Sequence, residues 1–163
     1  MKVIFLDIDG VLNCSKTPNP KKLPYIIDRR LLRRLIRVVD QTSAKIILTS
    51  TWRYDPIGRY AAKHYGIRYI GWTPDLAKKP RCQEIKQWLR EHPHVSRYVV
   101  IDDEDDELDT LPLFQPSSNT GLSPEIAKAV IRYLNADSDE DMRRSSLFRM
   151  VQDATAVLRR HPG

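Results

Sequence analysis

Two aspartates separated by one residue stand directly after an apolar run near the start of the chain. The run covers residues 2–6, and Asp7-Ile8-Asp9-Gly10 follows it. Side chains alternate between the two faces of a strand, so carboxylates two positions apart leave its end in the same direction. Such a pair can bind a hard cation such as Mg²⁺, and an aspartate beside the cation can attack phosphorus. The alternative explanation is a strand followed by an ordinary Asx-Gly turn.

Two further apolar runs also end in polar side chains. Residues 45–48 lead into Thr49-Ser50-Thr51, and residues 97–101 lead into the acidic residues 102–106. Each run is short and nearly continuous in apolar residues, which is typical of parallel strands buried on both faces.

Helical patterns separate these runs. Asp28 can cap a helix extending to about Asp40, a second helix fits residues 55–65, and a third starts at Pro80 or Arg81. This order predicts an α/β fold with a three-layer, Rossmann-like open sheet, mainly parallel, and right-handed crossovers. Ligands of such sheets bind beyond the carboxyl ends of the strands, so the polar groups after the three runs are expected to converge on one site. These groups are Asp7, Asp9, Thr49, Ser50, Asp102 and Asp103.

The order of these motifs resembles that of the haloacid dehalogenase (HAD) phosphatase superfamily. Its motifs are Asp-x-Asp-Gly after a strand, a Ser or Thr at a strand end, a Lys or Arg ahead of a helix, and a strand ending in acids. The segment 49–53 and the turn at 119–123 resemble the small HAD domains associated with RNA-repair proteins and polynucleotide phosphatases. The resemblance spans residues 1–135, the expected catalytic domain. Residues 136–163 are expected to form a helical extension, with a helix at about 140–160 packed on the same domain or on a partner.

The resemblance implies roles for the acidic residues. Asp7 would be the nucleophile that forms an aspartyl-phosphate, and Asp9 would protonate the leaving oxygen and later activate water. Mg²⁺ would be held by Asp7, the backbone carbonyl of Asp9 and one acid of the Asp102-Asp103 pair. Asp103 is preferred as that ligand, with Asp102 and Asp106 orienting the waters of the metal.

The resemblance also implies groups that bind the phosphoryl oxygens. Ser50 is preferred as the hydroxyl, with Thr49 as the alternative. The cation of the third motif is Arg81, which directly precedes the helix, or Lys79, and Lys78 is a third candidate. The choice matters because arginine offers a planar fork of donors and lysine a point charge.

Charge and aromatic residues bear on the substrate. The chain carries a formal net charge of +6, yet residues 102–109 hold seven acids and no base, which leaves +13 elsewhere. A basic surface around an acidic pocket suits a polyanion such as nucleic acid, although it could serve solubility alone. Trp52 could stack on a base and Arg53 could hold a phosphate, with packing as the alternative role of Trp52. Thr49, Thr51 and Gly10 complete the expected substrate-binding group.

The intervals between the motifs leave no room for a cap domain, the insertion that encloses small substrates in many HAD phosphatases. From Asp9 to Ser50 the chain must hold a loop, a helix and a strand, and from Ser50 to Arg81 a helix and a short strand near 68–70. An uncapped site resembles those of family members that act on macromolecules. Loop 13–27, rich in proline and lysine, is then either a mobile rim or a plain connector.

We therefore predict a Mg²⁺-dependent phosphomonoesterase that removes a terminal phosphate from nucleic acid, with repair proteins as candidate partners. The alternatives are a protein phosphatase, a small-molecule phosphatase or a non-catalytic binding module. Two cysteines, Cys14 and Cys82, make no disulfide framework. The first apolar run is too short for a signal peptide, and no segment reaches the ~20 apolar residues of a membrane span, so a cytoplasmic protein with no membrane contact is expected.

Overall fold

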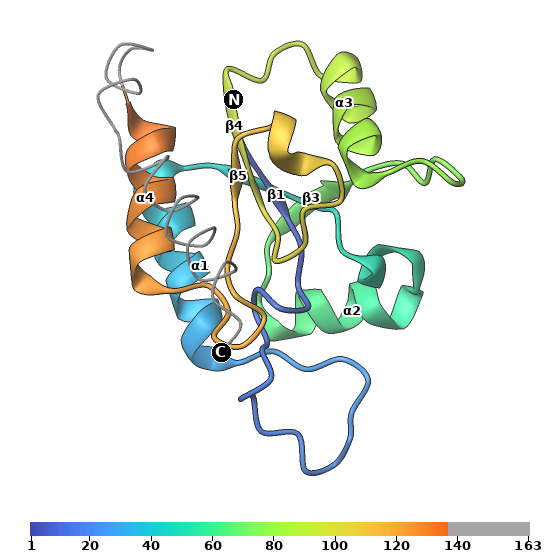
Figure 1. The fold of residues 1–163 in the computed structure, drawn as a ribbon, viewed down its shortest axis with the longest axis vertical. Coiled ribbons are helices and arrows are strands. Elements are labelled where there is room, and N and C mark those ends of the chain that lie inside the picture. The colour runs from blue at the N-terminus through green and yellow to red at the C-terminus, as the bar shows by residue number, and fades with distance from the viewer. Residues whose placement is uncertain (137–163) are drawn as a thin grey trace, which may run out of the picture.

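A single parallel sheet forms the centre of the computed structural model, which describes residues 1–136 (Figure 1). The strand order is β3-β2-β1-β4-β5, and all four neighbouring pairs are parallel. The strands are β1 (Lys2–Leu6), β2 (Lys45–Leu48), β3 (Tyr69–Trp72), β4 (Arg97–Ile101) and β5 (Leu113–Phe114). The predicted α/β open sheet is confirmed. The predicted helix at about 140–160 lies outside the described residues and stays a prediction.

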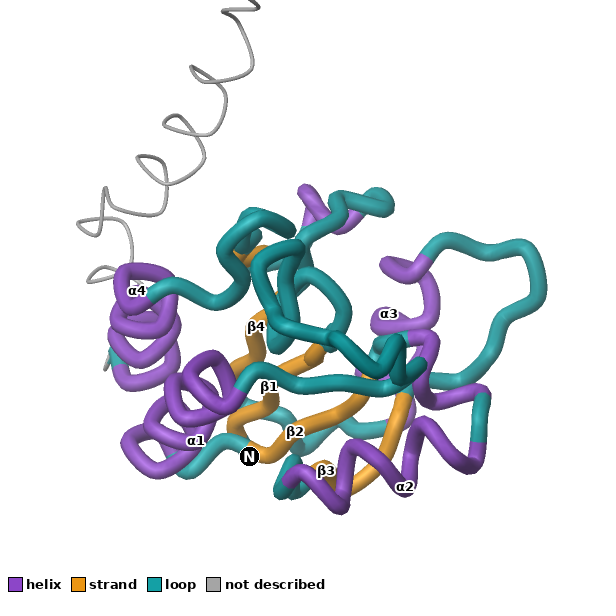
Figure 2. Tube along the Cα trace, turned by 90° about the horizontal axis from the view of Figure 1, so that it is seen from below, coloured by secondary structure: helices purple, strands orange, loops and turns teal. Residues whose placement is uncertain are grey.

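Helices cover both faces of the sheet, as Figure 2 shows. The helices are α1 (Arg29–Thr42), α2 (Pro56–Tyr65), α3 (Arg81–Glu91) and α4 (Pro124–Asn135), with short 3-10 turns η1 (Thr51–Tyr54) and η2 (Leu108–Thr110). One core cluster joins α1, α2 and α4 to one face of the sheet, around Ile4, Leu6 and Leu48. A second cluster joins α3 and η2 to the other face, around Phe5 and Trp88. The fold therefore has three layers.

Local signals in the sequence account for where the helices start. The side chain of Asp28 accepts a hydrogen bond from the backbone N–H of Arg30 and caps α1. Asp55 caps α2 in the same way, and a proline occupies the first turn. Ser123 caps α4 by accepting from the backbone N–H of Ile126. These caps fix the helix entrances on the side of the sheet where the strands end.

The register of the strands aligns three polar residues just beyond their ends. Leu6 is opposite Leu48 on one side and Ile101 on the other. The pairing continues one step further, because the N–H of Asp7 donates to the carbonyl of Ile101 and the N–H of Thr49 donates to that of Leu6. Asp7, Thr49 and Asp102 consequently lie at the same level across β1, β2 and β4.

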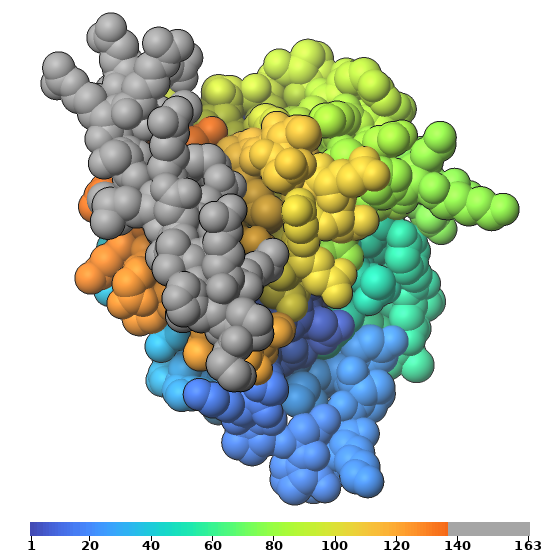
Figure 3. All heavy atoms as spheres, in the orientation of Figure 1, coloured from blue at the N-terminus to red at the C-terminus, as the bar shows by residue number. Residues whose placement is uncertain are grey.

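The intervals between the motifs contain no additional domain. Loop 13–28 and α1 connect Asp9 to β2, while η1, α2, β3 and a short loop connect Ser50 to Arg81, and all of these residues are described. In Figure 3 the dark-blue start of the chain reaches the surface between the yellow segment that follows β4 and the blue loop. No helix within residues 1–136 is long and apolar enough to cross a membrane.

Candidate active site

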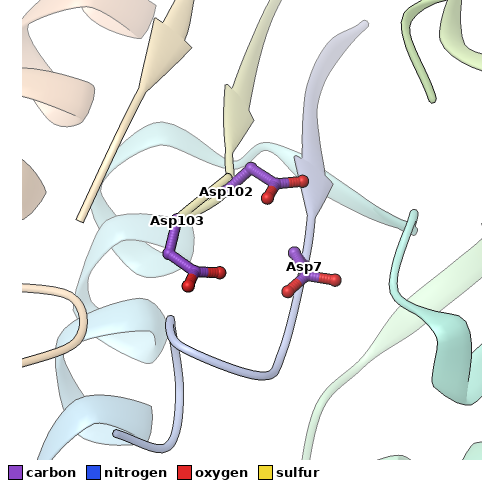
Figure 4. A group of neighbouring side chains, drawn as sticks. All are labelled: Asp7, Asp102 and Asp103. Atoms are coloured by element: carbon purple, nitrogen blue, oxygen red, sulfur yellow. The ribbon is translucent and has the colours of Figure 1, made fainter. Parts of the chain in front are cut away.

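Three carboxylates meet at the carboxyl ends of β1 and β4. Asp7, Asp102 and Asp103 each offer an oxygen, and these oxygens lie within 4.8 Å of one another. Figure 4 shows Asp7 at the tip of β1 facing the two acids that follow β4. Asp7 is 5% exposed and Asp102 is fully buried. Clustered carboxylate oxygens are the donor set that hard divalent cations prefer, so this group can hold a metal ion.

Gly10 makes room for one of these carboxylates. Its φ angle is +74°, in the left-handed region, and a Cβ at this position would stand 2.1 Å from the carboxyl carbon of Asp103. Any side chain at this position would displace the carboxylate of Asp103. Gly10 thus lies against the acidic cluster, and the absence of a side chain there leaves room for the carboxylate of Asp103.

The cluster concentrates negative charge away from water. Burial, reinforced by the charge of Asp102, raises the pKa of Asp7 to about 8, against the opposing effect of Arg81. Burial likewise raises the pKa of Asp102 to about 6 and shifts the pKa of Asp103 upward. Because three acids share the site, a cation that binds them relieves both the desolvation and the mutual repulsion.

Arg81 brings a fixed positive charge into the cluster from the start of α3. Its Nη1 donates to Asp102 Oδ2 and lies 3.6 Å from Asp7 Oδ1. Burial lowers the pKa of Arg81, but the carboxylates of Asp102 and Asp7 more than offset this, so its pKa lies above the ordinary value. Lys78 and Lys79, the other candidates for the third motif, are exposed. Of the three, Arg81 is the one in contact with the acids.

Asp106, expected to orient metal-bound water, contacts the same helix start. Its Oδ2 accepts a hydrogen bond from the backbone N–H of Arg81 at 2.9 Å. Asp106 therefore fastens the acidic loop after β4 to the first turn of α3, and it is not a member of the three-carboxylate group.

Two side chains donate hydrogen bonds to the carboxylate of Asp9, which is not a member of the three-carboxylate group. Asn13 Nδ2 donates to Asp9 Oδ1 at 2.7 Å, and Trp52 Nε1 donates to Asp9 Oδ2 at 2.9 Å. Asn13 also accepts from the N–H of Gly10 and donates to the carbonyl of Ile26. Sequence reasoning missed Asn13, although an amide four residues after Asp9 in a tight turn is a recognisable signal.

The hydroxyls of the second motif are both buried, in different positions. Thr49 shares the level of Asp7 and Asp102, and within the described residues its Oγ1 has no hydrogen-bond partner. Ser50 Oγ accepts from the N–H of Trp52 at 3.4 Å and caps η1. Thr51 is exposed. The unpartnered hydroxyl beside the acids belongs to Thr49.

Trp52 and Arg53 point into the protein rather than toward a surface open to substrate. Trp52 is 2% exposed and packs edge-on against Tyr25 at 4.8 Å between ring centroids. Arg53 is 3% exposed, and its Nη2 lies 2.5 Å from Glu84 Oε2 on α3. Its Nη1 donates to the carbonyls of Thr49 and Ser50. Packing, the alternative role of Trp52, agrees with this placement.

The open, all-parallel five-stranded sheet with helices on both faces is consistent with a HAD-like domain. Residues 3–127 match the family described as the HAD domain in Swiss Army Knife RNA repair proteins, and the chain belongs to this family. The matched region extends from β1 into the first turn of α4 and includes all four motifs. A comparison with curated proteins finds no match.

Proposed function

We propose that the chain is a Mg²⁺-dependent phosphomonoesterase that removes a terminal phosphate from nucleic acid through an aspartyl-phosphate on Asp7. The observation that carries the proposal is the buried group of Asp7, Asp102 and Asp103 with Arg81 at the strand ends, in a chain of an RNA-repair HAD family. A nucleophile, a cation site and a phosphate-binding charge are thereby within reach of one phosphoryl group.

The reaction has two steps. In the first, a carboxylate oxygen of Asp7 attacks phosphorus, the bond to the leaving alcohol breaks, and Asp9 gives that alcohol oxygen a proton. In the second, Asp9 takes a proton from water, the water oxygen attacks phosphorus, and inorganic phosphate leaves Asp7. The hydrogen bonds from Asn13 and Trp52 aim the Asp9 carboxyl, so these two residues position the acid and base.

The acidic group fits a hard cation, and Mg²⁺ suits its all-oxygen donors. Asp7 and Asp103 would hold the ion directly, with the backbone carbonyl of Asp9. Both oxygens of Asp102 already accept hydrogen bonds, from Arg81 and from the N–H of Glu104, which supports Asp103 as the direct ligand. Asp102 and Asp106 would orient its waters. When bound, the ion supplies positive charge to the phosphoryl oxygens.

Arg81 and a hydroxyl of the second motif would bind the phosphoryl oxygens. The contacts of Arg81 with Asp7 and Asp102 favour it over Lys79. The register and the unpartnered Oγ1 favour Thr49 over Ser50, the residue preferred from the sequence. Thr49→Val should then reduce kcat more than Ser50→Ala.

A substrate panel tests the proposal. Oligonucleotides with 3′ or 5′ phosphate, a phosphopeptide and an aryl phosphate should be assayed with Mg²⁺ and with EDTA. We expect turnover of at least one phosphorylated oligonucleotide end, dependence on Mg²⁺, and loss of activity in Asp7→Asn. Asp40→Asn, an exposed acid of α1, is the matched control.

Each contrary result overturns a defined part of the proposal. Activity retained by Asp7→Asn would exclude the aspartyl-phosphate. Turnover of the phosphopeptide with none of the oligonucleotides would make the chain a protein phosphatase. Activity in EDTA equal to that in Mg²⁺ would remove the metal from the reaction.

A further inference from the structure

Aromatic and basic side chains gather on an exposed surface next to the site. Residues 51–72 contain six aromatic residues: Trp52, Tyr54, Tyr60, Tyr65, Tyr69 and Trp72. We use the name aromatic-basic surface for Arg59, Tyr60, Lys63, Tyr69 and Trp72, which come from α2 and from the edge strand β3. Figure 2 shows α2 beside β3 at the margin of the molecule.

Two rings of this surface are exposed, and two lie next to cations. Tyr60 is 69% exposed and Trp72 is 46% exposed. The guanidinium carbon of Arg59 lies 5.0 Å from the ring centroid of Trp72, and Lys63 Nζ lies 5.2 Å from that of Tyr69. The centroids of Tyr69 and Trp72 are 6.3 Å apart. Aromatic faces interleaved with positive charges are the features that hold single-stranded nucleic acid.

The charge of this region is predominantly positive. Within residues 51–72 the single acid is Asp55, and it is already engaged by the hydroxyl of Tyr25 and the N–H of Ile57. Arg59, Lys63 and Arg68 are the bases outside the buried Arg53 pair. A second copy of this chain placed symmetrically on the surface would bring basic groups against basic groups. A polyanion is the complementary occupant.

Contacts connect this surface with the candidate active site. Trp52 of η1 donates to Asp9, and the next residue, Arg53, accepts a hydrogen bond at its carbonyl from Arg59 Nη1. Arg59 in turn lies over Trp72. Arg59 of the aromatic-basic surface therefore contacts the residue that directly follows Trp52, which donates to Asp9.

We propose that the aromatic-basic surface binds single-stranded nucleic acid, with bases stacked on Tyr60 and Trp72 and backbone phosphates near Arg59 and Lys63. The inference rests on the proposed function in one respect: the bound strand is the one whose end enters the acidic site. The stacking role expected of Trp52 is thereby assigned to Tyr60 and Trp72, because these rings are exposed and Trp52 is buried.

Tryptophan fluorescence provides a direct test. Of the three tryptophans, Trp52 and Trp88 are buried, so Trp72 is the one whose emission an approaching base can quench. The full-length protein in EDTA should be titrated with a single-stranded oligonucleotide that carries no terminal phosphate. We expect quenching, a Kd that rises steeply with salt, and weaker binding of a duplex of the same length. Trp72→Phe should abolish the signal.

Two variants locate the binding surface. Tyr60→Ala should raise Kd by about 5- to 150-fold, the range of one lost stacking contact, and Lys63→Ala should reduce the salt dependence. The double variant Arg33→Ala, Arg37→Ala removes two exposed charges from α1 and is the matched control, expected to change Kd far less.

Three results would overturn the inference. They are the absence of quenching, equal affinity for the duplex, and an equal loss of affinity in the α1 control. Quenching that depends on protein concentration rather than on oligonucleotide would assign the surface to self-association instead. Turnover of an aryl phosphate by Tyr60→Ala is measured separately, so failure of this inference is distinct from failure of the proposed phosphatase activity.

Discussion

Replacing Glu84 by glutamine should lower the free energy of unfolding by about 3–5 kcal/mol, the usual cost of breaking a buried ion pair. The side chains of Arg53 and Glu84 are only 2% and 5% exposed. Glu84 Oε1 also accepts from the N–H of Leu76 and from the hydroxyl of Tyr54. Glutamine keeps the volume but leaves the Arg53 charge buried without its counterion, and Arg53 Nε has no partner within the described residues.

Chemical denaturation followed by circular dichroism measures this loss. For a chain of this size the same change corresponds to a fall in Tm on the order of 6–20 °C. Glu91→Gln removes an exposed acid from the end of the same helix and should stay within about 0.5 kcal/mol of the wild type. A double variant, Arg53→Met with Glu84→Met, should be more stable than Glu84→Gln, because no buried charge is left unpaired.

The substitution should also slow the reaction below the unfolding temperature. Arg53 donates to the carbonyls of Thr49 and Ser50, and Glu84 lies one turn after Arg81 in α3. The Arg53–Glu84 pair therefore connects the second motif with α3, the helix that begins at Arg81 of the third motif. Unfolding of Glu84→Gln within about 0.5 kcal/mol of the wild type would refute the reasoning, because that value belongs to surface substitutions.

Three further predictions concern the acidic cluster and Asp9. In EDTA, the free energy of unfolding should fall as pH rises from about 4 to about 8, because burial raises the pKa of Asp7 to about 8 and the folded state holds its proton more tightly than the unfolded state. Chemical denaturation at several pH values measures this fall, and Mg²⁺ should reverse it. A free energy of unfolding that does not change with pH would contradict the prediction. Gly10→Ala should raise the Mg²⁺ concentration needed for activity, because the added Cβ displaces Asp103. Gly66→Ala is the control, since Gly66 also has a positive φ but nothing lies within 4 Å of an added Cβ. Equal effects of the two variants in the metal titration would count against the clash. Trp52→Phe should reduce turnover of alkyl phosphates more than of aryl phosphates, since it removes the donor to Asp9; an equal reduction in both assays would separate Trp52 from the acid role.

Local sequence patterns were sufficient to predict most of the sheet and the meeting of acids at its edge. Apolar runs at residues 2–6, 45–48 and 97–101 became β1, β2 and β4. Because parallel strands end at the same edge, acids after two of them had to meet, and Asp7 and Asp102 do. By contrast, β5 was missed, since its two residues are too few for a detectable pattern.

Pairs between distant residues could not be predicted in the same way. Arg53 follows the second motif directly, where an exposed cation beside the substrate is a reasonable interpretation of the sequence. Its partner Glu84 is 31 positions away and belongs to the polar-looking start of α3. No periodicity joins two charged residues across such a distance, so only the folded chain reveals that each neutralises the other in the core.

The two buried residues of η1 connect three of the motifs within the described residues. Trp52 reaches back to Asp9 of the first motif, and Arg53 reaches across to Glu84 beside the third. Both side chains are buried and hydrogen-bonded inside the protein. Along the same stretch of chain, Tyr60 on α2 and Trp72 on β3 are among the aromatic side chains that remain exposed. One short segment thus contacts two of the motifs that we propose to be catalytic, while the helix and strand that follow it present the surface on which we place the nucleic acid.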